Sequence, residues 1–290
     1  MIHAIHRQSY GVTDFRLRLY WDSFTPITCQ LPPLPEQQKI AAILSTQDKV
    51  IELKEKLLAQ KQQQKKYLMQ QLLTGKKRLS GFNEKWKVEK FSEIFAFLST
   101  NTLSRDNLFE GVGAIQNIHY GDILTKFNEV IDLDCVCLPS VKESAIPNKC
   151  ATVKSGDIII ADTAEDLTAG KVVEVQNIGD RVIYSGLHTM LCRPKEQLFS
   201  DGWLGFYMNS EAYHKQLIPY IAGVKVMAIS KSNIVKTYIA IPSKAEQAAI
   251  VEILSTADHE IDLLQKSIES EKQKKKALMQ LLLTGKVRVK

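Results

Sequence analysis

Long apolar segments are missing from this 290-residue chain, and so is a cysteine framework. No run of about 18 apolar residues occurs, and residues 1–20 lack an apolar signal stretch, so we predict a cytoplasmic protein without a membrane span. The cysteines are odd in number, with no C-x-x-C pair and no histidine at zinc-finger spacing. This pattern argues against disulfides and zinc and favours reduced, buried thiols. The cysteines are Cys29, Cys135, Cys137, Cys150 and Cys192.

Signature motifs of enzymes are also missing. There is no N-P-P-Y-like amino-methyltransferase motif, no H-E-x-x-H and no G-x-S-x-G. The tract 168–171 lacks the leading glycine and the trailing Ser or Thr of a phosphate-binding loop. Glu165 between Asp162 and Asp166 suggests a metal site, but a capped polar loop fits this spacing better. We therefore predict a non-catalytic chain that holds no cofactor and no metal.

The net charge is only mildly basic. Lys and Arg number 38 against 32 Asp and Glu, which gives a formal charge of +6. Such an excess permits nucleic acid as a partner without demonstrating it. The function must therefore be inferred from the pattern of the sequence.

A duplication organises the chain. Residues 36–79 and 246–289 align without a gap at an offset of 210, and 23 of the 44 positions are identical. The shared cores read ILST and LMQxLLTGK. An ungapped match of this quality identifies the two segments as copies of one unit.

Each copy is predicted to form one long helix, over 35–76 and 245–286. Pro35 suits a first helical turn, and Gly75 and Gly285 are C-terminal stop signals. Apolar residues recur at helical spacing between these limits. About 40 residues make a rod of roughly 60 Å, which is typical of a coiled-coil arm.

The centre of each arm is polar, over 61–66 and 271–276. It is either a solvated charged face or a stretch that docks a partner or faces phosphates. A helix this polar is marginal alone, and the obvious stabilising partner is the other copy. We expect the arms to pair antiparallel, with Leu57, Leu58 and Ile268 near the middle of the seam.

A different kind of sequence lies between the arms. Residues 80–242 are rich in short β-type runs punctuated by turn residues, which predicts an α+β globular domain. One helix is expected over Asp201–Leu217. The expected strands cover 112–118, 157–161, 171–175, 182–184 and 238–241.

Residues 1–30 are too short to fold alone but carry Tyr10, Phe15, Trp21 and Phe24. They echo the segment that precedes the second arm, so we interpret them as the tail of a first domain whose front is missing. The predicted organisation is a remnant (1–30), a first long helix (31–79), a globular domain (80–242) and a second long helix (243–290).

Several ordered motifs resemble the specificity subunits of type I restriction–modification systems. The resemblance covers about residues 10–290. The motifs are LPPLPEQQKIAAIL (31–44), the arm ends LMQQLLTGKKRL (68–79) and LMQLLLTGKVRV (278–289), SGFNEKW (80–86), GDIIIADTAED (156–166), GLHTMLCRPK (186–195) and GVKVMAISKSNI (223–234).

The resemblance implies a non-catalytic subunit. In that family two target-recognition domains, held apart by two antiparallel helices, each read half of a split DNA site. The helices carry two methyltransferase subunits, and the restriction and translocase subunits join the complex. S-adenosylmethionine and ATP belong to those partners. Because most of one recognition domain is absent here, autonomous recognition of a bipartite site is in doubt.

Candidate DNA contacts occur in loops of residues 80–242. Asn and Gln can pair with adenine in the major groove, and acidic residues after Thr163 can accept from cytosine N4. Lys225, which follows Gly223, can reach a phosphate because glycine allows close backbone approach. An ordinary surface loop is the alternative reading for each residue alone. The candidates are Gln116, Asn117, His119, Tyr120, Thr163, Lys171, His188, Thr189 and Lys225.

Two functions remain open at this point. The chain either reads DNA sequence for a methyltransferase–endonuclease complex, or it is a structural adaptor that dimerises or caps the methyltransferase without reading. Exposed aromatic residues in 1–30 would form an apolar patch, and such patches usually mark an interface. We therefore expect a homodimer or completion by a complementing fragment, and no membrane partner.

Overall fold

The computed structural model describes residues 5, 9, 18–28, 31–111, 113–147 and 149–289. The chain forms two compact units, one of residues 1–59 with 262–290 and one of residues 60–261. We call them unit 1 and unit 2. Tyr10, Phe15 and Cys29, which the sequence singled out, lie outside the described residues.

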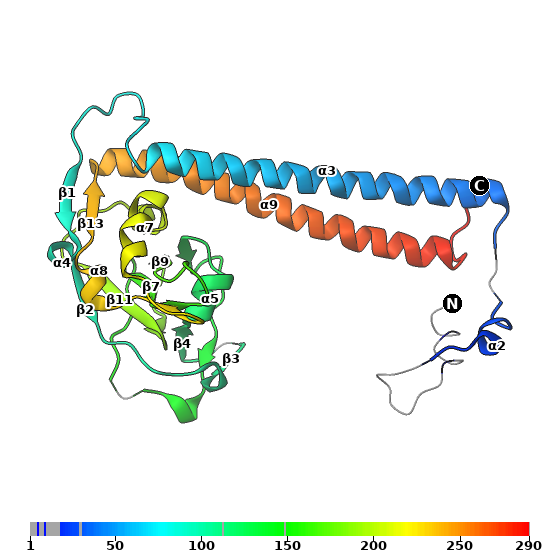
Figure 1. Ribbon diagram of the computed structural model, residues 1–290, viewed down its shortest axis with the longest axis horizontal. Coiled ribbons are helices and arrows are strands. Elements are labelled where there is room, and N and C mark those ends of the chain that lie inside the picture. Colours follow the sequence, from blue (N-terminus) through cyan, green and yellow to red (C-terminus); the bar gives the residue numbers. More distant parts are fainter. Residues whose placement is uncertain are drawn as a thin grey trace. The chain divides into compact units, whose positions relative to one another are not determined.

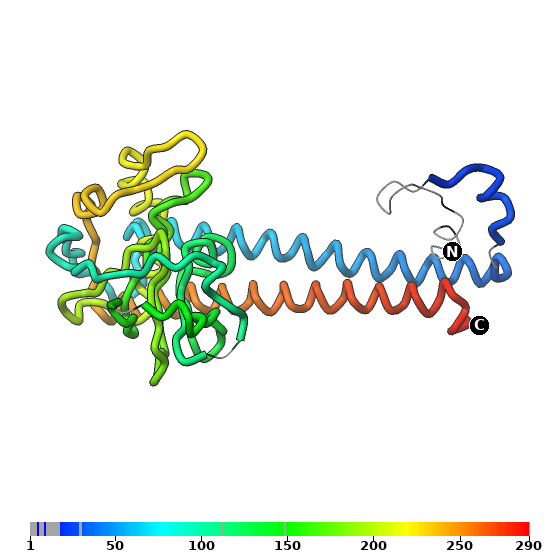
Figure 2. The backbone as a smooth tube through the Cα atoms, turned by 90° about the horizontal axis from the view of Figure 1, so that it is seen from below, coloured from blue at the N-terminus to red at the C-terminus, as the bar shows by residue number. Residues whose placement is uncertain are grey.

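Two long helices are the most extended elements. Helix α3 covers Leu34–Leu72 and helix α9 covers Lys244–Leu283, within one turn of the predicted limits. Within each unit, the segments of α3 and α9 run side by side (Figures 1 and 2). Each helix ends before a left-handed glycine, Gly75 at φ 68° and Gly285 at φ 69°. The predicted stop signals are thereby confirmed, because this conformation favours glycine.

The duplicated sequence makes duplicated contacts, one set in each unit. In unit 1, Arg288 binds Glu36 at 2.6 Å and Lys275 pairs with Asp48. In unit 2, Arg78 binds Glu246 at 2.6 Å and Lys65 pairs with Asp258 at 2.5 Å. Each contact of one unit becomes the contact of the other when 210 is added or subtracted. Within each unit the paired helical segments run antiparallel.

Buried apolar positions repeat in the same way. Ile40, Ile51 and Leu72 are buried, and so are their counterparts Ile250, Ile261 and Leu282. Of the residues expected at the middle of the seam, Ile268 is buried, but the expectation for Leu57 was wrong because its side chain is exposed. The duplicated position explains why Leu57 is exposed. It corresponds to the polar Ser267 in the other copy, which indicates the solvent-facing side of the helix.

The polar centres of the arms are partly paired. Lys61 binds Glu260 at 2.7 Å, and Lys272 binds Glu55 at 2.8 Å. In unit 1, a hydrogen bond from Gln47, together with one from Lys54, lowers the pKa of Glu271 to about 2. Many of these charges therefore bind the opposite helix, while others remain a solvated face.

Unit 2 is built on a five-stranded sheet with the order β2-β11-β7-β9-β5. Strands β5 and β9 are parallel, and the other neighbours are antiparallel. The strands are β2 (Phe95–Leu98), β11 (Thr189–Pro194), β7 (Ile158–Ala161), β9 (Val172–Gln176) and β5 (Val130–Asp132).

Three smaller sheets complete the strands. A four-stranded sheet has the order β10-β4-β6-β3, and two-stranded sheets join β1 to β13 and β8 to β12. The strands are β10 (Val182–Ser185), β4 (Ile115–Ile118), β6 (Ser140–Val141), β3 (Leu108–Phe109), β1 (Lys87–Lys90), β13 (Tyr238–Ile241), β8 (Thr163–Ala164) and β12 (Met227–Ala228). The mixed helix and sheet content predicted from sequence is confirmed.

Both faces of the five-stranded sheet are buried. Ile158 and Ile160 point into one apolar cluster, which includes Trp203 and Tyr213. Ile159 lies between them in sequence and points into a second cluster, with Ile123 and Ile183. Alternating sides along a strand thus fill two cores, which explains the uninterrupted apolar run of β7.

The single helix expected over Asp201–Leu217 is two helices, α6 (Trp203–Met208) and α7 (Glu211–Leu217). Asn209 interrupts it, because its side-chain amide exchanges hydrogen bonds with both backbone groups of Val172 in β9. Ser210 then caps α7 by accepting a hydrogen bond from the amide of Tyr213. The remaining helical elements are α2 (Trp21–Phe24), α4 (Phe91–Ile94), α5 (Tyr120–Thr125), α8 (Lys231–Ile234), η1 (Arg105–Asn107), η2 (Glu143–Ala145) and η3 (Ile218–Tyr220).

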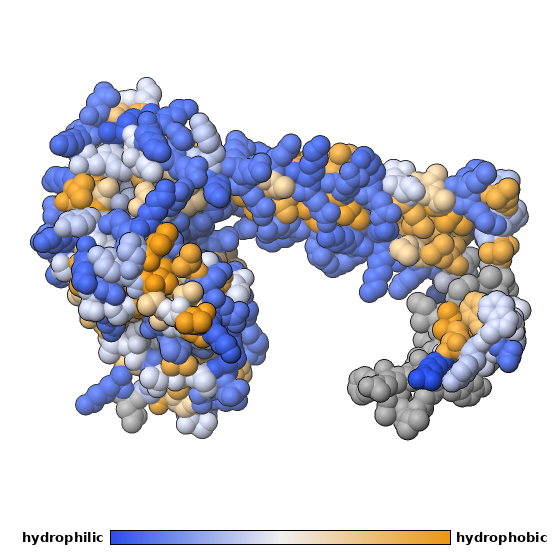
Figure 3. All heavy atoms as spheres, viewed as in Figure 1, coloured by the Kyte–Doolittle hydropathy of each residue, from blue (hydrophilic) through white to orange (hydrophobic). Residues whose placement is uncertain are grey.

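Unit 1 exposes apolar side chains. Trp21 and Phe24 are both exposed, with ring centroids 5.9 Å apart. Figure 3 shows further apolar surface over the first turns of α3 and the last turns of α9. Leu283 is 60% exposed there, while its counterpart Leu73 in unit 2 is 1% exposed within the apolar cluster. The same duplicated position is therefore covered in unit 2 and uncovered among the described residues of unit 1.

The four described cysteines are free thiols. Cys192 is buried, but Cys135 and Cys137 are exposed, so the prediction of buried thiols was wrong for these two. They follow β5 in a turn at the surface.

A wholly buried carboxyl, Glu174 of β9, holds the start of α6. It accepts hydrogen bonds from the amides of Gly202 at 2.7 Å and Gly205 at 2.9 Å. Burial raises the pKa of Glu174 to about 7, against the opposing effect of these hydrogen bonds. A native pKa above the unfolded value stabilises the fold at low pH, and this stabilisation is lost as pH rises through about 7.

We therefore expect unit 2 to unfold more easily at about pH 7.5 than at about pH 5, by up to about 3 kcal/mol from this group. The measurement is urea unfolding followed by tryptophan fluorescence at both pH values. Glu174→Gln should flatten this dependence, while the exposed Glu84→Gln should not. Equal pH dependence in the Glu174→Gln variant and the parent would contradict the assignment.

Candidate nucleic-acid interface

The first part of the candidate site lies where β4 meets α5. His119 caps α5, because its Nδ1 accepts a hydrogen bond from the amide of Gly121 at 3.2 Å. Burial, helped by the charge of Arg105, lowers the pKa of His119 and keeps the ring neutral. A neutral ring that accepts at Nδ1 carries its proton on Nε2. The ring of Tyr120 packs 4.6 Å from that of His119.

The second part is formed by the ends of β7 and β10. His188 is exposed in a left-handed backbone conformation, at φ 54°. Its Nδ1 lies 3.3 Å from Asp162 Oδ1 and 3.2 Å from Thr163 Oγ1. The ring of His188 also meets that of Tyr120 edge to face at 5.3 Å. Two segments far apart in sequence are thus joined through one aromatic contact.

A hairpin over residues 222–228 forms the third part. Its second strand, β12, pairs with β8, so that Ala228 lies opposite Thr163. The amide of Ile229 donates to the carbonyl of Asp162 at 2.8 Å, and the amide of Asp162 donates to the backbone carbonyl of His188 at 3.1 Å. Backbone hydrogen bonds therefore join the base of the hairpin that carries Lys225 to the segments of Thr163 and His188. We call Tyr120, Asp162, Thr163, His188 and residues 222–228 the loop surface.

Three candidates from the sequence lie beneath this surface. Asn117 is wholly buried and accepts a hydrogen bond from Asn101 Nδ2 at 2.8 Å. Thr189 is buried and donates to the carbonyl of Gly186 at 2.5 Å, and Gln116 is half-buried in β4. The expectation that Asn117, His119 and Thr189 present their polar groups to DNA needs correction, because all three side chains are buried. They support the surface from below.

Lys171 is also placed differently from the expectation. Its Nζ donates to the carbonyls of Leu124 at 3.3 Å and Phe127 at 2.9 Å. Burial lowers the pKa of this half-buried amine. Lys171 therefore caps the C-terminal end of α5, where a cation interacts favourably with the helix dipole, instead of reaching outward.

Arg105 and Lys126, which sequence reasoning did not single out, hold α5 in place. Arg105 binds the buried carboxylate of Asp122 at 2.6 Å, and Lys126 binds it at 3.1 Å. Burial raises the pKa of Asp122, but these hydrogen bonds outweigh that effect and the pKa is lowered. The sequence carries only a weak signal for this arrangement, because Arg105 and Asp122 are 17 residues apart.

Buried polar atoms without partners gather under the loop surface. Among the described residues, four buried side-chain atoms have no hydrogen-bond partner: Gln116 Oε1, Asn117 Nδ2 and Asp122 Oδ2 of β4 and α5, and Trp203 Nε1 of α6. Leaving such an atom unsatisfied costs about 1–3 kcal/mol, so most folds avoid it.

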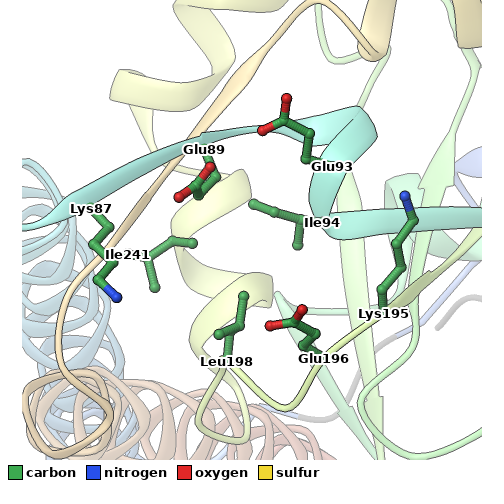
Figure 4. Close-up of a pocket in the computed structure, with 8 residues that line it drawn as sticks. All are labelled: Lys87, Glu89, Glu93, Ile94, Lys195, Glu196, Leu198 and Ile241. Carbon is green, nitrogen blue, oxygen red and sulfur yellow. The ribbon is translucent and has the colours of Figure 1, made fainter.

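A shallow pocket lies elsewhere in unit 2, between β1, α4 and the segment after β11 (Figure 4). Three carboxylates, Glu89, Glu93 and Glu196, line it together with Lys87 and Lys195. Mixed charges with a surplus of carboxylates do not suit a polyanion. Within the described ranges, no group of three or more His, Cys, Asp or Glu residues is placed to hold a metal ion.

The fold defines the class first: a mixed helix–sheet domain accompanied by a duplicated long helix. A family model described as "Type I restriction modification DNA specificity domain" matches residues 6–63 and 83–272. The chain belongs to that family. Membership in a specificity family agrees with the prediction of a non-catalytic chain.

A curated relative supports the assignment. The type I restriction enzyme MjaVIII specificity subunit of Methanocaldococcus jannaschii is 29% identical over 282 residues, which cover 92% of this chain and 64% of the relative. A second relative from that organism is 30% identical and is covered over 59% of its length. The chain therefore spans less than two thirds of the length of the curated relatives it matches.

Solved structures share the fold. The S subunit of a type I restriction–modification system from M. genitalium superposes with a TM-score of 0.55 at 15% identity, covering 95% of this chain and 68% of that one. A chain from a study of complex assembly and conformational transition of the type I R-M system gives a TM-score of 0.52 at 19% identity, covering 87% and 60%. No helix in the described part of the chain is long and apolar enough to cross a membrane.

Proposed function

We propose that this chain reads DNA sequence for a type I restriction–modification complex. The observation that carries the proposal is the loop surface, where loops from three parts of unit 2 bring aromatic, polar and basic side chains together. Direct readout needs such groups, since imidazole, hydroxyl and carboxylate groups bond base edges and lysine binds phosphate. Family membership supplies the class of target, double-stranded DNA.

In this proposal the helices and the globular domain have different roles. Residues 80–242 form one recognition domain that reads half of a split site, mounted on a coiled-coil pair formed by 31–79 and 243–290. The helices dock methyltransferase subunits, and the restriction subunit joins through that complex. The chain itself holds no cofactor, because methyl transfer and translocation belong to those partners.

Residues 1–30 fit a completing contact. The exposed Trp21, Phe24 and Leu283 favour a second copy of the chain or a complementing specificity fragment as the partner of unit 1. Sedimentation of the purified chain, alone and with the methyltransferase, tests this association.

The function is tested by selection from a pool of randomised DNA duplexes with the full chain. We expect enrichment of a short motif at salt concentrations that suppress non-specific binding. Co-expression with the methyltransferase, followed by methylome sequencing, should show methylation at sites that contain this motif. Association with the methyltransferase without any enriched motif would favour the structural adaptor.

Lys225 offers a test of phosphate binding. Lys225→Ala should weaken binding to all duplexes by a similar factor and reduce the slope of log K against log salt by about one. The reason is that a phosphate contact carries no sequence information. The measurement is a salt titration of fluorescence anisotropy. The control is the exposed Lys85→Ala, which changes the net charge equally outside the loop surface. Equal slopes for Lys225→Ala and the parent would remove Lys225 from the interface.

A further inference from the structure

The tip of the hairpin over 222–228 is apolar on both sides of Lys225. Val224 is 94% exposed and Val226 is 55% exposed. These are β-branched side chains with few rotamers, so they keep a fixed shape in water. An apolar side chain that is almost wholly solvated contributes little to the stability of the fold, so Val224 is free to contact another molecule.

The hairpin is rigid as well as exposed. The amide of Ala222 donates to the carbonyl of Ala228 at 3.1 Å, and the amide of Ala228 donates back at 2.9 Å. Gly223 has φ 147°, and a Cβ at this position would lie 1.9 Å from the carbonyl oxygen of Val226. The tight closure of the tip therefore requires glycine. At the base, Ile229 is buried in the apolar cluster and anchors the hairpin to the core.

The size and neighbours of the tip suit DNA better than a protein. A stable protein interface uses roughly 20–30 residues on each side, far more than this tip provides. The tip carries a cation between its two valines, and it shares the β8–β12 sheet with Thr163 of the loop surface. Apolar side chains that enter a base step from a minor groove commonly stand beside basic residues, because phosphates flank the step.

We infer that Val224, supported by Val226, is an apolar wedge that enters a base step and unstacks it when the loop surface engages DNA. Lys225 binds the adjacent phosphate and holds the tip at the groove. Unstacking is easiest at flexible pyrimidine–purine steps, so the wedge selects a deformable step that no side chain needs to read. This inference rests on the proposed function and adds an indirect component to the recognition.

The test places 2-aminopurine at each position of a duplex taken from the randomised-pool selection. Binding of the full chain should raise the fluorescence strongly at one step, since the probe is quenched when stacked. Val224→Ser should abolish this rise and weaken binding about ten-fold, because two methyl groups no longer leave water. Lys225→Ala should weaken binding while keeping the rise in the bound complex. The exposed Val88→Ala on β1 is the matched control and should change neither.

Each outcome bears on the inference. A parent chain that binds the selected duplex tightly without any fluorescence rise overturns the wedge and leaves the proposed function intact. A Val224→Ser variant that binds and unstacks DNA normally, but no longer retains the methyltransferase, reassigns the tip to a protein contact. If no sequence is selected from the pool, the proposed function is overturned, and the inference about Val224 is overturned together with it.

Discussion

Replacing Glu246 by alanine should lower the free energy of unfolding of unit 2 by about 3 kcal/mol. Glu246 is buried and accepts hydrogen bonds from Arg78 Nε at 2.6 Å, Arg78 Nη2 at 2.8 Å and Trp86 Nε1 at 3.0 Å. Its removal leaves a guanidinium that is only 28% exposed without its counter-charge. Breaking one side of a buried ion pair is costly because the remaining charge cannot regain its hydration.

The duplicated residue provides the control for this prediction. Glu36→Ala removes the corresponding partner of Arg288, but that guanidinium is 63% exposed and returns to water. The loss should therefore be clearly smaller at Glu36. Urea unfolding followed by tryptophan fluorescence and by circular dichroism measures both variants. Equal losses at the two positions would show that burial of the arginine does not decide the cost.

Replacing His188 by alanine should change which sequences the chain prefers, by about 1–3 kcal/mol at one base pair. The imidazole is exposed and held between Asp162, Thr163 and Tyr120, so its remaining ring atoms can meet a base edge in a fixed orientation. Selection from the randomised pool with the variant should yield a motif relaxed at one position. Lys225→Ala, in contrast, should leave the motif unchanged.

Asn117 serves as the contrasting variant for this experiment. Because its side chain is buried and bonded to Asn101, Asn117→Ala should reduce thermal stability more than His188→Ala does. The opposite result would be a selected motif that changes with Asn117→Ala at unchanged stability and stays the same with His188→Ala. It would mean that Asn117, and not His188, contacts the bases.

The long helices could be predicted from the sequence because their signals are local. The 210-residue repeat, the helical spacing of apolar residues and the two terminal glycines all act within a few turns of the chain. The strands β7, β9, β10 and β13 were predictable for the same reason. The break at Asn209 was not, because it depends on hydrogen bonds to Val172, a residue of another element.

The candidate site was only partly predictable. Sequence reasoning singled out Tyr120, Thr163, His188 and Lys225, which lie at the loop surface, together with His119, whose side chain is buried. It did not separate these from Asn117 and Thr189, because adjacent residues of a strand point in opposite directions and burial depends on what covers each face. The exposure of Val224 could not be predicted either, because the sequence around it resembles that of an ordinary strand.

The equivalence of the two sets of ion pairs has a genetic consequence. A crossover between the repeated segments would delete one period of 210 residues and leave a chain with a single arm. That arm would still carry both members of each pair, the acidic one near its start and the basic one near its end. A straight helix cannot bring them together, so only two such chains, related by a two-fold axis, would satisfy them. The duplicated pairs would thus let a single-arm chain assemble only with a second copy of itself.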